Sequence, residues 1–194
     1  MNHIPKLGPS DQMTVEEFLA FTLTRPDEER WELIEGVPVL NASPTDYHQI
    51  VVANILGVLW QINAEQGAAW FVLPGTGTRV PASRHSLPQP DVMVKERAPT
   101  GSAVSDDALV ILEVLSKSTR KRDAQTKRRL FERTGVREYW LVDPELDTVH
   151  VFRPTAEGRL VRVEEFTAED GGTLTTPLLP GCGIDVRALF RPTL

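Results

Sequence analysis

Two acidic residues and one lysine stand out because each lies in a segment that is otherwise suited to burial. Glu113 interrupts the aliphatic run LVILEVL at residues 109–115, and Asp91 opens the short apolar stretch PDVMV. Lys127 lies in the helical pattern that follows Glu113. An ionised side chain in apolar surroundings is costly unless it is paired or bound to a metal. These three residues are therefore the first candidates for a chemical site.

Asp91 and Glu113 have the chemistry of a site for a hard divalent cation. They are 22 positions apart, which suits two neighbouring strands joined by a loop at residues 95–108. Two carboxylates that converge at strand ends supply the oxygen ligands that Mg²⁺ or Mn²⁺ prefers. There is a simpler alternative, in which Glu113 forms a salt bridge with an arginine of the next helix and Pro-Asp is an ordinary turn element.

Lys127 is expected to point toward the interior of the protein. On a helical wheel it falls on the side of Leu130 and Phe131, which should face the core. Most of the Lys and Arg residues between 117 and 133 fall on the opposite side. An inward lysine near two carboxylates suits phosphodiester hydrolysis, because it can orient the attacking water and stabilise negative charge in the transition state. The alternative is a structural i,i+4 pair between Asp123 and Lys127.

Glu32 is a fourth candidate, whereas other reactive residue types are discounted. Glu32 shares a strand face with Ile34 in RWELIEG and is expected to point inward, while Glu35 alternates to the other side. His48 lies near the start of a long helix and is interpreted as a structural or hydrogen-bonding residue. Cys182 is the only cysteine, and nothing near it in the sequence indicates a nucleophile.

The elements that must position these residues alternate between helix and strand. A helix is predicted at 13–22, where Thr14 and Glu17 form a capping box, and longer helices are predicted at 43–67 and 118–135. Two strands at 30–41 turn at Glu35-Gly36, four strand candidates lie between 68 and 115, and a β meander follows at 136–177. Helices among strands favour an α/β or α+β fold. The strand at 108–115 is apolar on both faces and should be covered on both sides.

Composition excludes several classes of protein. The 194 residues suit one domain, predicted at 13–194 after a flexible lead-in at 1–12. The chain has no apolar run long enough for a membrane span and no secretory leader, so a cytoplasmic location is expected. A single cysteine excludes an internal disulfide and a multi-cysteine zinc site. The net charge of −6 argues mildly against non-specific coating of nucleic acid, although eight of the 21 basic residues cluster between 117 and 133.

Several motifs carry a resemblance to a known family. WELIEGVPV, PDVMV, LVILEVLSKST, RDAQTKRRLFERTGVREYWLVDP and VHVFR occur in this order over about residues 13–190. In this respect the chain resembles the Uma family of restriction-endonuclease-like proteins, which is part of the PD-(D/E)xK nuclease superfamily. The resemblance implies a restriction-endonuclease-like fold, with a mixed central β-sheet flanked by helices and with acids and a lysine around a divalent metal.

The same resemblance assigns roles to individual residues. Asp91 and Glu113 would be the metal-binding acids; to these we add, as part of our own hypothesis, the backbone carbonyl of Val114 as an extra ligand. Glu32 matches the acid of the N-terminal ELI-G motif of the family. The usual lysine of the superfamily would stand two residues after Glu113, where this chain has Leu115. The resemblance therefore implies a lysine displaced to the following helix, which is Lys127.

Together these observations predict a metal-dependent endonuclease that hydrolyses DNA phosphodiester bonds with Mg²⁺ or Mn²⁺. The catalytic residues would be Glu32, Asp91, Glu113 and Lys127, and the outer basic helix face with loop 95–108 would contact phosphates. A homodimer is expected from the resemblance and from apolar meander strands that need cover. Two alternatives stay open: a dimeric DNA-associated protein with weak or no hydrolysis on the same scaffold, and hydrolysis of another phosphorylated substrate.

Overall fold

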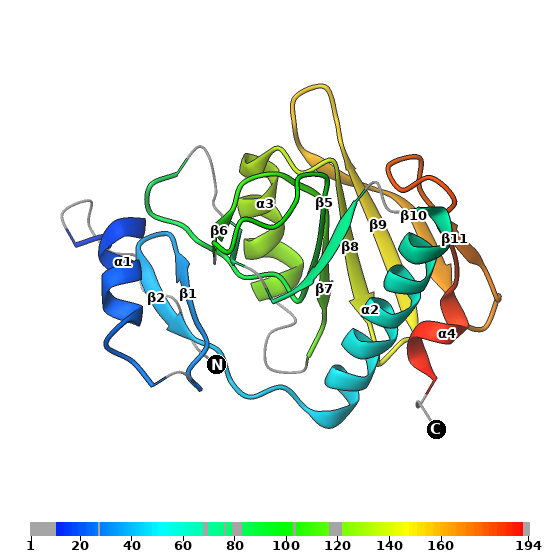
Figure 1. Cartoon of the computed structure of the whole chain (residues 1–194), viewed down its shortest axis with the longest axis horizontal. Helices are drawn as coiled ribbons and strands as arrows, with labels where there is room; N and C mark the ends of the chain where they lie inside the picture. The colour runs from blue at the N-terminus through cyan, green and yellow to red at the C-terminus, as the bar shows by residue number, and fades with distance from the viewer. Residues whose placement is uncertain are drawn as a thin grey trace.

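The core of the protein is a mixed β-sheet (Figure 1). The computed structural model describes residues 11–26, 28–67, 70–75, 77–78, 83–102, 104–116 and 122–191, without the side chains of 77–78 and 122–124. Within these residues six strands form the sheet in the order β10-β9-β8-β7-β5-β3. They are β3 (Phe71–Pro74), β5 (Val92–Lys95), β7 (Ala108–Val114), β8 (Glu138–Asp143), β9 (Thr148–Pro154) and β10 (Leu160–Thr167). Among the neighbours in this sheet, β7 and β8 are parallel and the other pairs are antiparallel.

Strand β7 is covered on both faces, as its apolar sequence predicts. Leu112 belongs to the apolar cluster that includes helix α2 (Asp46–Gln66). Ile111, which points to the other face, packs with Phe131 of helix α3 (Arg128–Thr134). In Figure 1 the two helices flank the sheet, which confirms the predicted fold class.

The N-terminal elements form a smaller unit beside the sheet. Helix α1 (Val15–Thr22) begins with the predicted capping box between Thr14 and Glu17. Strands β1 (Trp31–Ile34) and β2 (Val37–Leu40) form an antiparallel hairpin. Its two turn residues are Glu35 and Gly36, with φ angles of 49° and 82°. Two-residue hairpins favour turns with positive φ at both positions, because such turns match the twist of the flanking strands.

The hairpin docks onto the larger unit through apolar side chains. Leu33 of β1 forms an isolated bridge with Leu87, which lies ahead of β5. Ile34 and Val39 pack on Leu130 of α3. These contacts hold β1, and with it Glu32, next to the helix that carries Lys127.

The helix that follows β7 differs from the sequence prediction. Residues 118–135 were expected to form one α-helix, but residues 117–121 lie outside the described part of the chain. The first described segment, η1 (Arg122–Lys127), is a π-helix, and α3 follows it directly. Gly135 ends α3 in the left-handed conformation, as expected. Wide helical turns of this kind are frequent at functional sites.

The C-terminal part corrects the predicted meander. Strands β8, β9 and β10 form it, but β11 (Thr173–Thr175) leaves the sheet and pairs with β12 (Gly183–Asp185), which is followed by helix α4 (Val186–Phe190). Leu174 and Ile184, which are partners in this pair, belong to the apolar cluster that contains α2, so β11 is buried there and does not extend the sheet beside β10.

The remaining short elements lie in a segment that the structure describes only in part. Strand β4 (Gly77–Thr78) pairs in parallel with β6 (Val104–Ser105). One of the four strand candidates between 68 and 115 is GTRVP at 77–81, and its residues 79–81 lie outside the described part of the chain. Most of the predicted lead-in, residues 1–10, is outside it as well. None of the helices in the described residues is long and apolar enough to cross a membrane.

Candidate active site

The sheet topology brings Asp91 close to the end of β7. Strands β5 and β7 are antiparallel, and Val92 lies opposite Leu112. Asp91 immediately precedes β5 and therefore lies beside the last residues of β7. Its Oδ2 accepts a hydrogen bond of 2.9 Å from the backbone N–H of Val114. The predicted convergence of Asp91 with the end of this strand follows directly from the pairing register.

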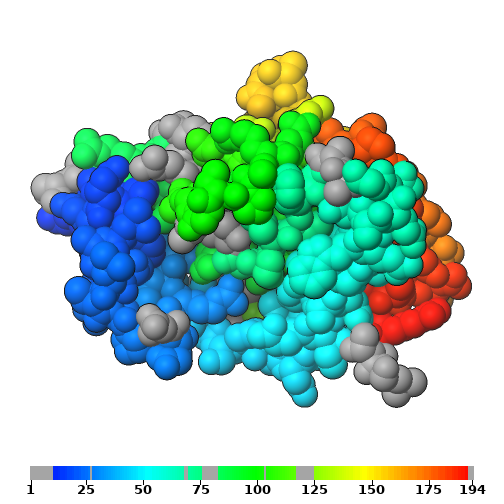
Figure 2. Space-filling model, viewed as in Figure 1, coloured from blue at the N-terminus to red at the C-terminus, as the bar shows by residue number. Residues whose placement is uncertain are grey.

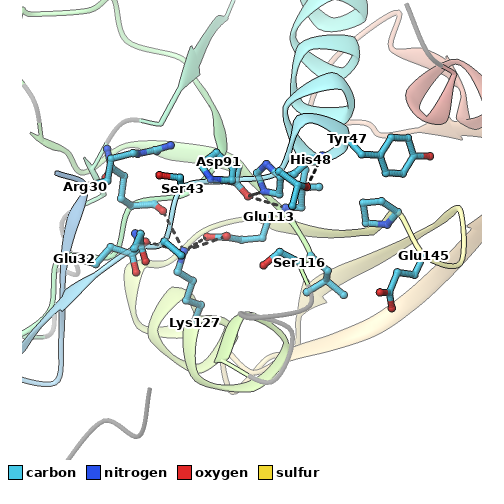
Figure 3. A pocket seen from close by; sticks show the side chains of 18 residues that line it. Arg30, Glu32, Ser43, Tyr47, His48, Asp91, Glu113, Ser116, Lys127 and Glu145 are labelled. Carbon is cyan, nitrogen blue, oxygen red and sulfur yellow. Dashed lines mark hydrogen bonds and ion pairs between the residues drawn. The ribbon is translucent and has the colours of Figure 1, made fainter. Parts of the chain in front are cut away.

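Lys127 connects Glu113 with Glu32. Its Nζ donates to Glu113 Oε1 and Oε2 at 2.9 and 3.1 Å and forms an ion pair of 2.8 Å with Glu32 Oε1. It also donates to the carbonyl oxygen of Gln89 at 3.1 Å. Figure 3 shows the lysine between the two glutamates. Only 3% of Lys127 is exposed and 1% of each glutamate, so the expected inward direction of all three side chains is confirmed.

These residues line a cavity that opens to the surface. Its volume is about 480 Å³, and its lining includes Glu32, Asp91, Glu113, Lys127 and Val114. In Figure 2 the surface is hollowed between the N-terminal elements and the cyan helix α2. Three carboxyl groups and one ammonium give this cluster a formal net charge of −2. A divalent cation would neutralise that charge.

Asp91 is held as a carboxylate by its surroundings. His48, in the first turn of α2, places Nε2 3.4 Å from Asp91 Oδ2. Burial raises the pKa of Asp91, but the hydrogen bonds from His48 and Val114 and the positive charge of Lys127 outweigh it and leave the pKa below its ordinary value. Asp91 is therefore ionised at neutral pH.

The donor set fits a hard divalent metal such as Mg²⁺ or Mn²⁺. Asp91 and Glu113 offer carboxylate oxygens to one cavity, and the buried Glu32 Oε2 has no hydrogen-bond partner among the described residues. No group of three His, Cys, Asp or Glu side chains in the described part of the chain already has the arrangement of a metal site. Mg²⁺ is commonly held by only one or two carboxylates and completes its shell with water and substrate oxygens.

Three residues at this site were missed or given little weight in the sequence analysis. The carbonyl of Gln89 accepts from Lys127, His48 contacts Asp91, and Arg30 lines the cavity. Arg30 precedes Glu32 by two positions, and residues two apart in a strand share a face. This alternation could have predicted that Arg30 lies on the side of Glu32. Gln89 acts through its backbone, which leaves no mark on residue type. The contact of His48 depends on how the long helix docks.

The cations of loop 95–108 are engaged within the loop itself. Lys95 Nζ lies 2.9 Å from Asp107 Oδ1 and donates to Ser105 Oγ at 2.8 Å. Arg97 pairs with Asp106 and Asp107 at 2.6 and 3.0 Å. Several residues of the expected basic cluster, including Lys117, Arg120 and Lys121, lie outside the described part of the chain. The expected contact of this loop and helix face with phosphates stays a prediction.

Comparisons with known proteins show the family and the fold of the chain. Residues 15–187 match the model of the Uma2 family, whose description is "putative restriction endonuclease". A crystal structure from Anabaena variabilis, titled as a putative nuclease of the DUF820 family, superposes with a TM-score of 0.74. The two share 19% sequence identity, and the match covers 92% of this chain and 97% of the other. At this identity the likeness shows the fold. No curated protein matches the chain in sequence.

Proposed function

Because this chain belongs to the Uma2 family, we propose that it is a metal-dependent endonuclease that hydrolyses phosphodiester bonds of DNA. The observation that supports this most directly is the arrangement of Lys127 between two buried glutamates, in the cavity that also contains Asp91. A surface salt bridge would not require such burial. Burying an ammonium and three carboxyl groups in one cavity costs desolvation free energy, and their mutual attraction offsets that cost only in part. A requirement of function explains why the chain keeps them.

Asp91 and Glu113 are proposed to hold Mg²⁺ or Mn²⁺, with the backbone carbonyl of Val114 as a further ligand. When bound, the ion supplies Lewis-acid stabilisation of the phosphate and lowers the pKa of a water molecule. The N–H of Val114 and the imidazole of His48 both contact Asp91 Oδ2, which fixes the carboxylate at the cavity that it lines.

Lys127 is proposed to act on the phosphate and on the attacking water. In hydrolysis the water oxygen bonds to phosphorus, the bond to the leaving sugar oxygen breaks, and that oxygen takes up a proton. Negative charge builds on the phosphate oxygens during this exchange. An ammonium already oriented by Glu32 and Glu113 stabilises this charge without reorganising. Glu32 is thus proposed to position Lys127.

DNA and a second copy of this chain are the proposed partners. The family description supports a nucleic-acid substrate, and the homodimer is proposed from the resemblance and from the exposed valines of the edge strand β10. Sedimentation velocity on the purified protein tests the dimer, which a single monomeric species at all concentrations would contradict.

Cleavage assays test the proposed activity. Purified protein would be incubated with supercoiled plasmid, linear duplex and single-stranded DNA, in Mg²⁺, in Mn²⁺ or in EDTA. The wild type should cleave at least one of these in the presence of metal. Asp91→Ala, Glu113→Gln and Lys127→Ala should each lower the rate by about 100-fold or more, since each removes a group acting on the transition state.

Arg133→Ala is a matched control on the same helix. Its side chain is 47% exposed and lies outside the cavity lining, so this variant should cleave like the wild type. Cleavage that survives both Asp91→Ala and Lys127→Ala would indicate a contaminating nuclease. Absence of cleavage together with absence of metal binding would favour the DNA-associated scaffold protein.

A further inference from the structure

A second cavity adjoins the cavity at Asp91. This second cavity has a volume of about 300 Å³ and shares Arg30, His48, Gln89 and Asp91 with the first. It extends toward Gly75, in the turn after β3. Asp91 therefore lines both cavities, which adjoin at the four shared residues and are together called the hollow.

Arg30 borders both cavities at their junction. The carbonyl of Arg30 accepts from the N–H of Asn41 at 2.8 Å, which extends the β1–β2 ladder by one step and fixes the backbone. Its side chain shares the strand face of Glu32 and reaches the turn at Gly75. A β-carbon on Gly75 would lie 2.9 Å from Arg30 Nη2, so the guanidinium occupies space that a side chain there would fill. Figure 3 shows Arg30 and His48 on opposite sides of Asp91.

Within the described part of the chain, Arg30 differs from the other cations near the site because it has no acidic partner. Lys127 is held by Glu32 and Glu113, and Lys95 is held by Asp107. Among the described residues, Arg30 forms no ion pair, and its side chain is exposed to the hollow. The acids of the site repel a phosphate, so a substrate needs a compensating cation beside them. A guanidinium matches phosphate oxygens with two parallel donors.

We propose that the second cavity is a subsite for the nucleotide next to the cleaved bond, and that Arg30 binds its phosphate. This inference rests on the proposed function and specifies its substrate: a polynucleotide that continues on both sides of the bond, which is cleaved internally. Arg30 is then a substrate-binding residue, which acts on a phosphate that does not react.

Kinetics on a defined oligonucleotide test the subsite. Arg30→Ala should raise KM about tenfold and change kcat by less than threefold, because a charge-assisted hydrogen bond to a non-reacting phosphate is lost. The KM of Arg30→Lys should lie between those of the wild type and Arg30→Ala, since an ammonium keeps the charge but lacks the two parallel donors of a guanidinium. The control is Arg25→Ala, which removes the same charge from a residue that stacks on Phe21 outside both cavities, and it should leave KM unchanged.

Neutral linkages locate the contact. Once the cleaved bond is mapped, one methylphosphonate is placed at the neighbouring linkage on the 5′ or the 3′ side. In one of these two substrates the wild type should lose about tenfold in kcat/KM, while Arg30→Ala should lose nothing further. Equal losses in the wild type and Arg30→Ala with both substrates would overturn the proposal, as would an unchanged KM in Arg30→Ala.

Binding separates this inference from the proposed function. In metal-free buffer, fluorescence anisotropy with a labelled oligonucleotide should show about tenfold weaker binding by Arg30→Ala and a salt dependence reduced by about one phosphate contact. If the wild type binds DNA but never cleaves it, the proposed activity is contradicted, while the difference in binding between the wild type and Arg30→Ala still tests the subsite. Equal binding by wild type and Arg30→Ala, or no binding by either, would contradict the subsite itself.

Discussion

Lys127 and the two glutamates around it form a unit whose members depend on one another. The lysine is buried, and its ammonium lies between Glu113 and Glu32. A buried pair contributes little net stability compared with apolar residues of the same shape, but removing one partner leaves an uncompensated charge. The unit is therefore better explained by a requirement for a fixed ammonium in the cavity than by a requirement for stability.

Glu32→Gln tests this dependence through stability. The variant keeps an oxygen for Lys127 but removes one of its two charged partners, so the free energy of unfolding should fall by about 1–2 kcal/mol. Urea denaturation at pH 7 measures it. Glu35→Gln is the matched control in the same hairpin, since its side chain is 57% exposed and lies 3.7 Å from Arg133, and it should change stability by less than about 0.5 kcal/mol. Equal effects of the two substitutions would show that Glu32 does not hold the lysine.

At the scale of elements, the segment between β5 and β7 is fixed by polar contacts. Lys95 at the end of β5 is buried and contacts both Ser105 and Asp107, and Ser105 donates to Asp107 at 2.6 Å. Arg97 also contacts Asp107. One carboxylate thus joins both ends of the loop and sets where β7 begins. Burial raises the pKa of Asp107, but these donors outweigh it and hold the pKa well below its usual range.

Asp107→Asn should show a pH-dependent loss of stability. The folded-state pKa is lowered, so the stabilisation is complete above the unfolded value of about 4 and is lost as pH falls below it toward the folded value. The variant should be less stable than wild type by about 1–2 kcal/mol at pH 7, and the difference should shrink below pH 4. Urea denaturation at several pH values measures this. Asp106→Asn, with a 62% exposed side chain, should differ little from wild type throughout. A difference in stability between the wild type and Asp107→Asn that grows as pH falls would contradict the lowered pKa of Asp107 in the folded protein.

The sequence predicted those elements that have a regular pattern of their own. The apolar run of β7, the capping box of α1 and the turn at Glu35-Gly36 depend on local chemistry, and all three are found. The same holds for the inward direction of Lys127, because α3 keeps an apolar side at Leu130 and Phe131. Register then brings Asp91 and Glu113 together without further information.

The elements that were missed are short or depend on distant contacts. Strand β12 has three residues and α4 has five, which is too few for a periodic pattern. β11 reads as a fourth meander strand because nothing local distinguishes pairing with β10 from pairing with β12. The contact between His48 and Asp91, and the place of Arg30 at the hollow, arise only when α2 and the hairpin dock on the sheet.

At the scale of the whole molecule, the candidate site joins two units that fold around different clusters. Glu32 comes from the hairpin, whereas Asp91, Glu113 and Lys127 come from the sheet and the helix behind β7. The hairpin is held by Ile34 and its neighbours on α3. The ammonium is therefore bound from both sides only when the docking is complete, which couples the geometry of the site to the integrity of the fold.

Cys182 gives a measure of that integrity. It is the only cysteine in the chain, is 5% exposed, and belongs to the core cluster shared by α2, the sheet and α4. Burial, with a smaller effect of the Glu138 charge, raises the pKa of its thiol to about 11. Since the thiolate is the reactive form, the native protein at pH 7 should react with a thiol reagent at least about 100-fold more slowly than the protein in urea.

Thiol labelling would then report on opening of the whole molecule. Over a range of low urea concentrations, the labelling rate should rise with the slope of global unfolding measured by circular dichroism, because the cysteine lies in the central core. Glu32→Gln should speed labelling in proportion to its loss of stability, and Glu35→Gln should not. Rapid labelling of native protein, independent of urea, would show that the C-terminal elements open locally. In that case β11, β12 and α4 would form a separate unit of low stability and not a part of the core that supports the site.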